Sequence, residues 1–295
     1  MANPVFNGDA FKKAARSSAA TAQPAQPGYG SQFQTYGDQA YGNPAGYGDQ
    51  GYGAPAGYGQ PGLQTPQNAG RLTFDDVMMK TLTVFGVLAV AVVVSFIIPF
   101  SAAAGLLVVG AIAGLVLGLV NSFKREPSPA LIVAYAVAEG FFAGGLTRVL
   151  EVQFPGIGIQ AVLATAAVFG VTFALFRSGK VRATPKLQRF FMIAVGAYLL
   201  FSLVNLVLML TGVVTDPWGL RGVEIAGIPL GAIIGVVVII LGAISLIMDF
   251  DQIQGAVAVG APKRMAWTCA FGLLVTVVWL YTEILRFIAI LRGND

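Results

Sequence analysis

Four carboxylates lie inside long apolar runs or at their ends, where an ionised side chain is costly. Glu139 lies near the middle of the third run and Glu283 inside the last one, while Asp249 and Asp251 lie where the sixth run ends. An ionisable group at membrane depth points to function, so these four residues are the candidate pH-sensing and ion-pathway groups. Two carboxyl groups held together in a dry site cannot both ionise easily, and such a pair titrates as a unit.

Calcium is the cation that best suits such a site. Carboxylate oxygens are hard ligands, whereas soft ligands are scarce, because Cys269 is the only cysteine and the chain has no histidine. We therefore take Asp249 and Glu283 as candidate calcium ligands. The missing histidine also removes the Ser-His and Cys-His catalytic pairs, so we expect no enzyme and no cofactor, with calcium as a transported ion only.

Each carboxylate also has a structural interpretation. Glu283 has Arg286 one turn later as an ion-pair partner, and Glu139 has Arg148 further along the same run. Glu139 could also bond a hydroxyl group on a neighbouring helix. The structural and functional interpretations stay open for any single carboxylate, and the group together favours function.

The depth of Asp249 depends on where the sixth helix ends. An end at Met248 would leave Asp249 at the membrane interface, but apolar residues continue to Val259, and Pro262 follows. We therefore expect one long helix, with Asp249 about 15 Å and Glu283 about 26 Å from the cytoplasmic ends of their helices. The difference of roughly 10 Å leaves direct contact between the two side chains open.

The elements that carry these residues are membrane-spanning helices. Hydrophobic residues make up 56% of the 295-residue chain and charged residues only 11%, too few for a water-soluble surface. Apolar runs of about 20 residues match the length needed to cross a bilayer. The sequence predicts an all-α membrane protein, a bundle of seven transmembrane helices within residues 73–295, over 81–99, 102–121, 130–149, 158–176, 190–213, 229–248 or longer, and 266–290.

The charges of the connections predict an orientation. Basic residues are frequent before the first run and in every second connection after it, and scarce in the others, where Arg221 is the one example. The positive-inside rule then places the N-terminus in the cytoplasm and the C-terminus outside, most simply in a bacterial cell membrane.

Residues 1–72 are predicted to be a disordered cytoplasmic tail. Tyr-Gly recurs there among Gln, Pro, Gly and Ala, with few aliphatic residues to bury. The tail could bind a cytoplasmic protein partner or be a passive extension. The small net charge of +4 and the dispersed basic residues exclude a nucleic-acid footprint, so the lipid bilayer is the expected surrounding.

Three motifs in this order resemble those of the Bax inhibitor family. Ala134–Gly140 is similar to the third span of that family, Asp249–Ile253 to the acidic end of its sixth span, and Leu280–Ile284 to the acidic motif of its seventh. The resemblance covers about residues 72–292. It implies seven spans and a pH-sensitive calcium leak, governed by Asp249 and Glu283 with Asp251 as an accessory.

Two features differ from the family pattern. Glu283 takes the place of the usual aspartate, and the second span lacks the arginine that calcium-leak members place against the acidic pair; Lys124 and Arg125 come only at its end. The first functional hypothesis is therefore a pH-sensitive calcium leak channel. The alternative is a non-conducting interaction protein that regulates a membrane protease or a stress response.

Overall fold

The computed structural model describes residues 70–124 and 126–293, in which seven helices are long and apolar enough to cross a membrane. The predicted tail, residues 1–72, lies outside the described residues except for its last three. The helices are α3 (Phe74–Ile97), α4 (Phe100–Phe123), α5 (Pro129–Gln153), α6 (Ile157–Arg177), α7 (Pro185–Leu210), α8 (Leu230–Ala258) and α9 (Ala266–Arg292).

The all-α bundle of seven spans is confirmed, with two helix starts that hydropathy placed too late. The first helix begins at Phe74 instead of residue 81, because Thr73 and Asp76 form a capping box that satisfies the first backbone amides. Helix α7 begins at Pro185 instead of residue 190, after the Thr184 side chain accepts a hydrogen bond from Leu187 N. The long sixth helix is also confirmed, since α8 continues to Ala258.

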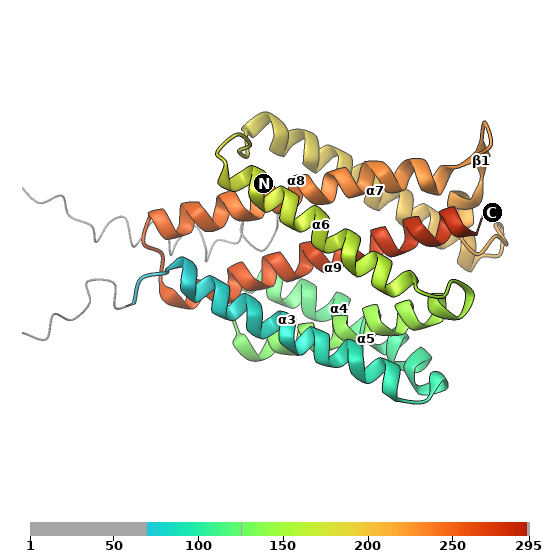
Figure 1. The fold of residues 1–295 in the computed structure, drawn as a ribbon, viewed down its shortest axis with the longest axis horizontal. Helices are drawn as coiled ribbons and strands as arrows, with labels where there is room; N and C mark the ends of the chain where they lie inside the picture. Colours follow the sequence, from blue (N-terminus) through green and yellow to red (C-terminus); the bar gives the residue numbers. More distant parts are fainter. Residues whose placement is uncertain (1–69, 125, 294–295) are drawn as a thin grey trace, which may run out of the picture.

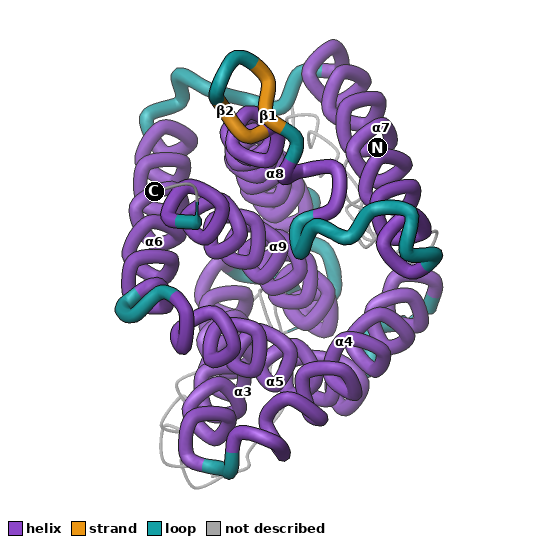
Figure 2. The backbone as a smooth tube through the Cα atoms, turned by 90° about the vertical axis from the view of Figure 1, so that its right-hand side faces the viewer, coloured by secondary structure: helices purple, strands orange, loops and turns teal. Residues whose placement is uncertain are grey.

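Helix α9 lies at the centre of the bundle, and the other helices surround it (Figure 2). It is the most buried of the seven spans, and α7 is the least buried. Helices α8 and α9 run side by side, joined by a short turn that contains the 3-10 helix η2 (Lys263–Met265), as Figure 1 shows. The two helices that carry Asp249 and Glu283 are therefore direct neighbours.

Glycines allow α5 to pack closely between α3 and α4. A Cβ on Gly110 of α4 would lie 2.7 Å from the Ala138 carbonyl oxygen of α5, and one on Gly140 of α5 would lie 2.7 Å from the Leu88 carbonyl oxygen of α3. Backbone atoms cannot give way at such distances, so these positions require glycine. The four-residue glycine spacing in these spans therefore serves helix packing.

The connections alternate between two ends of the bundle. The α4–α5, α6–α7 and α8–α9 connections carry Lys124, Lys180 and Lys263, and we call this end the basic end. The α3–α4, α5–α6 and α7–α8 connections lie at the opposite end. The α7–α8 connection is the most structured of them, with the 3-10 helix η1 (Gly219–Gly222) and a hairpin of β1 (Glu224–Ile225) and β2 (Ile228–Pro229).

Candidate functional site

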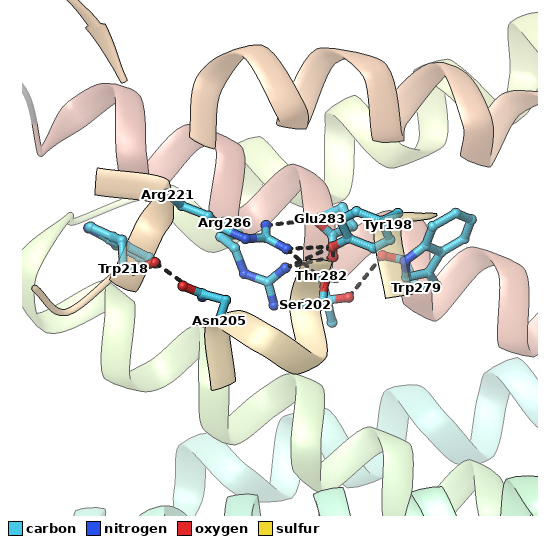
Figure 3. A network of polar contacts seen from close by, with 9 residues as sticks. All are labelled: Tyr198, Ser202, Asn205, Trp218, Arg221, Trp279, Thr282, Glu283 and Arg286. Carbon is cyan, nitrogen blue, oxygen red and sulfur yellow. Dashed lines mark hydrogen bonds and ion pairs between the residues drawn. The ribbon is translucent and has the colours of Figure 1, made fainter. Parts of the chain in front are cut away.

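Glu283 lies in a buried ionic cluster on α9. Its side chain is only 4% exposed, and its Oε1 atom lies 2.6 Å from Arg286 Nη1 and its Oε2 atom 3.4 Å from Arg221 Nη1. The Tyr198 hydroxyl of α7 also donates a hydrogen bond to Oε1 (Figure 3). Glu283 therefore has the predicted partner, Arg286, and two further partners.

Arg221 reaches this cluster from the α7–α8 connection. It is 5% exposed, and its Nη2 atom donates to the Tyr198 hydroxyl at 2.7 Å and to Ser202 Oγ at 3.3 Å. Removing charged groups from water is costly, and the cost is recovered when ion pairs and hydrogen bonds satisfy each group. The cluster places two guanidinium groups around one carboxylate and is well satisfied.

Asn205 of α7 positions the segment that carries Arg221. Its Oδ1 atom accepts a hydrogen bond from Leu220 N at 2.6 Å, and its Nδ2 atom donates to the Trp218 carbonyl oxygen at 3.5 Å, as Figure 3 shows for Trp218. Between them, Gly219 has a φ of +64°, and a Cβ there would lie 2.2 Å from Asn205 Oδ1. This position therefore requires glycine, and the connection folds back onto the bundle.

Asp249 occupies a different environment on α8. Its side chain is fully buried, and Thr276 Oγ1 of α9 donates a hydrogen bond to its Oδ2 atom at 2.6 Å. Ser245, one turn earlier on α8, has its Oγ atom 3.4 Å from Thr276 Oγ1 and donates to it, because the one hydroxyl proton of Thr276 is given to Asp249. The structure thus joins Asp249 to a short row of neutral hydroxyl groups between α8 and α9.

The two acids lie at different levels along α9. Thr276, which bonds Asp249, precedes Glu283 by seven residues, about 10 Å along the helix axis. Seven residues are close to two full turns, so Thr276 and Glu283 share one face of α9. Asp249 lies toward the basic end and Glu283 toward the opposite end.

Asp251 does not share the buried environment of Asp249. Two residues along a helix turn the side chain by about 200°, to the other side of α8. The Asp251 side chain is 35% exposed, and its Oδ1 atom lies 3.9 Å from Arg182 Nη1 at the basic end. A partly exposed ion pair of this kind contributes little stability.

Glu139 and Arg148 lie on α5 in separate environments. Glu139 is half-buried and packs on α4, where a Cβ on Gly114 would lie 2.7 Å from its Oε1 atom. Arg148 donates to the carbonyl oxygens of Ser95 at 2.6 Å and Ile98 at 2.5 Å. The Arg148 guanidinium therefore bonds the carbonyls at the end of α3, where a cation is favourable.

In the part of the chain that the structure describes, no group of three or more His, Cys, Asp or Glu side chains could hold a metal ion. A cation at Asp249 would have to complete its coordination from hydroxyl groups, backbone carbonyls or water. Calcium accepts all of these as ligands.

The family model of Bax inhibitor 1 like proteins matches residues 3–293. The chain belongs to the Bax inhibitor 1-like family. The match confirms the resemblance seen in the three sequence motifs, and it also extends over the N-terminal segment, which the motifs left outside. A comparison with curated proteins gave no match.

The sequence did not identify three residues of this site in the Bax inhibitor-like chain. Arg221 had one signal, as the single basic residue of a connection otherwise poor in them. Tyr198 and Thr276 had none, because a tyrosine or threonine in an apolar helix is ordinary until its neighbours are known. The second span lacks the arginine that calcium-leak members place against the acidic pair, so the sequence offered no distant ion-pair partner for Glu283. In the structure this partner is Arg221 of the α7–α8 connection.

Proposed function

We propose that this protein is a proton-regulated calcium leak of a bacterial-type cell membrane, in which Asp249 is the group that responds to protons. The observation that carries the proposal is the fully buried Asp249 carboxylate, bonded to the Thr276 hydroxyl between two neighbouring spans. A carboxylate kept at this depth is costly, which favours a functional role.

The deprotonated form of Asp249 would attract a cation. Its carboxylate and the hydroxyl oxygens of Thr276 and Ser245 are hard donors that suit calcium. Hydroxyl groups can rotate, so the Thr276 and Ser245 hydroxyls that now form hydrogen bonds at this level can turn their lone pairs toward an ion. The row of hydroxyls therefore supports cation passage at this level.

Protonation of Asp249 removes its negative charge and weakens cation binding. A protonated carboxyl can still donate a hydrogen bond to a hydroxyl oxygen, so the neutral form stays satisfied in the same place. Calcium flux is therefore expected to be higher at pH 8 than at pH 6.

The Glu283 cluster would close the route at the opposite end. Arg221 and Arg286 hold two positive charges beside Glu283, about 10 Å beyond the Asp249 level. Positive charge at this point repels a cation, so passage requires the cluster to separate. By the positive-inside rule, the basic end faces the cytoplasm and the cluster lies toward the outer side.

Calcium flux into liposomes that contain the full-length protein tests this proposal. Flux is measured from pH 6 to 8 for the wild type and for Asp249→Asn, which resembles the protonated side chain. We expect flux to rise with pH in the wild type and to stay at the low acid level throughout the range in Asp249→Asn.

Asp251→Asn is the matched control, because it makes the same chemical change two residues away on the same helix, at a partly exposed ion pair. Its flux should keep the pH dependence of the wild type. Identical profiles for the wild type and Asp249→Asn would contradict the proposal, and so would an equal effect of the two substitutions.

A further inference from the structure

Gly70–Leu72, which precede the N-cap Thr73 of α3, pair with the turn between α8 and α9. Leu72 N donates to the Ala261 carbonyl oxygen at 2.7 Å, and Lys263 N donates to the Gly70 carbonyl oxygen at 2.9 Å. Arg71 and Pro262 are the antiparallel partners at the centre of this pairing. The sequence placed these three residues in the tail, whereas here they are part of the bundle.

Side chains strengthen this backbone pairing. Leu72 is 2% exposed and belongs to the same core cluster as Ala261 and Met265 of the turn. Asp76, in the first turn of α3, lies 3.0 Å from Lys263 Nζ through its Oδ1 atom. We call residues 70–76 the strap, since they join α3 to the α8–α9 turn.

The turn held by the strap connects the two helices of the Asp249 site. Helix α8 ends nine residues after Asp249, and α9 begins ten residues before Thr276, so both lie about 15 Å from the turn. Helices transmit displacement as stiff elements over such lengths. A change in the angle of the turn would therefore change the contact between Asp249 and Thr276.

We propose that the strap is a latch that holds the α8–α9 turn and narrows the route at the Asp249 level, and that its release raises the flux that passes when the Glu283 cluster separates. The inference rests on the proposed function, because it adds a regulator to the same site. Residues 1–69 join the chain directly before Gly70, so a cytoplasmic protein that binds them would act on the strap first.

A disulfide across the strap tests the latch in the full chain. Arg71 and Pro262 lie opposite each other, and the hydrogen bonds on both sides are made by their neighbours. In such a non-hydrogen-bonded pair the Cα atoms are ~4.5 Å apart, a distance that a disulfide can bridge. We use Arg71→Cys with Pro262→Cys in a Cys269→Ala background. The oxidised protein should conduct less calcium than the reduced protein, and reductant should restore flux.

The opposite change releases the strap. Leu72→Pro removes the amide that donates to Ala261, whereas Leu72→Ala keeps the amide and loses only packing. We expect amide hydrogen exchange in residues 259–265 to be roughly fivefold faster in Leu72→Pro than in Leu72→Ala, the factor for one lost backbone hydrogen bond. Calcium flux should likewise be higher in Leu72→Pro than in Leu72→Ala.

A pair of substitutions at the Asp76–Lys263 salt bridge tests a second, milder release of the strap. Asp76→Asn removes the partner of Lys263, and Asp75→Asn makes the same change at the exposed neighbour. Exchange of the turn should increase less than about fivefold in Asp76→Asn and stay unchanged in Asp75→Asn.

The outcomes separate the two proposals. Equal flux in the oxidised and reduced disulfide variant, with pH-dependent flux intact, would overturn the latch and leave the proposed function standing. Unchanged exchange of the turn in Leu72→Pro would overturn the latch whatever the flux. A wild type without calcium flux would overturn the leak, and with it the gating role of the strap.

Discussion

Asp249 and Glu283 are both buried carboxylates in the interior of the same bundle, and they form different contacts with the helices around them. Glu283 lies between two guanidinium groups and a tyrosine hydroxyl, whereas Asp249 accepts a hydrogen bond from the neutral hydroxyl of Thr276. Burial of a carboxylate is thus not enough to assign it a role. The charge of its partners separates a group that locks the fold from one that can change state.

The difference has a physical cause in what each partner accepts. An arginine stays protonated at any physiological pH, so the Glu283 cluster is satisfied only while Glu283 is ionised. A hydroxyl can donate to a carboxylate or accept from a carboxyl, so the Asp249–Thr276 contact suits either protonation state. We therefore assign closure to the Glu283 cluster and proton sensing to Asp249.

The largest expected effect is the loss of stability when Arg221 is removed. Arg221→Gln should lower the free energy of unfolding by about 3 kcal/mol, because a buried carboxylate loses one of its charged partners. Thermal unfolding in detergent measures this. Arg292→Gln is the control: this arginine bonds the Pro155 carbonyl oxygen in an exposed contact and should contribute less than about 1 kcal/mol. Equal losses would break the comparison.

A double-mutant cycle sharpens the same point. Glu283→Gln combined with Arg221→Gln should cost less than the sum of the two single substitutions, with a coupling energy of about 1–3 kcal/mol. The reason is that the double variant leaves no unpaired charge between these two residues. Additive losses in thermal unfolding would show that Arg221 and Glu283 do not act as a pair.

A smaller loss is expected at the Asp249 site. Thr276→Val keeps the shape of the side chain and removes the hydrogen bond to Asp249, which should cost about 1.5–3 kcal/mol if Asp249 is ionised and about 1 kcal/mol if it is neutral. Measuring unfolding at pH 6 and pH 8 distinguishes these values. In the control Thr282→Val, the lost bond is to Trp279 of the same helix, and the cost should not vary with pH.

The smallest effect is expected at Asp251. Asp251→Asn removes a partly exposed ion pair with Arg182 and should change the free energy of unfolding by less than about 1 kcal/mol. A loss as large as that of Arg221→Gln would mean that exposure and partner charge do not rank these carboxylates.

The sequence predicted what depends on local pattern. Apolar length gave the seven spans, the late helix breakers gave the full extent of α8, and the three-residue spacing gave the Glu283–Arg286 pair. The sequence could also have predicted that Asp251 lies apart from Asp249, because side chains two residues apart on a helix point to different sides. In the sequence it groups with Asp249, because both belong to the motif Asp249–Ile253.

The remaining features depend on how distant segments fold together. Hydropathy contains no sign that the α7–α8 connection turns back and buries Arg221, since this requires the Asn205 contacts and the left-handed Gly219. The pairing of Gly70–Leu72 with the α8–α9 turn is a backbone contact between segments far apart in the chain. The start of α3 was placed late because its first turns carry Asp75, Asp76 and Lys80.

Infrared difference spectroscopy tests most directly whether Asp249, and not Glu283, gains a proton on acidification. Spectra of the protein in membranes at pH 6 and pH 8 report the carbonyl band of a protonated carboxyl group. Because Glu139 is another partly buried carboxyl group inside a span, all variants are measured in a Glu139→Gln background. We predict that the band appears at pH 6 in this background and with Glu283→Gln added, and that it is missing with Asp249→Asn added. A band that persists in Asp249→Asn and disappears in Glu283→Gln would contradict the assignment.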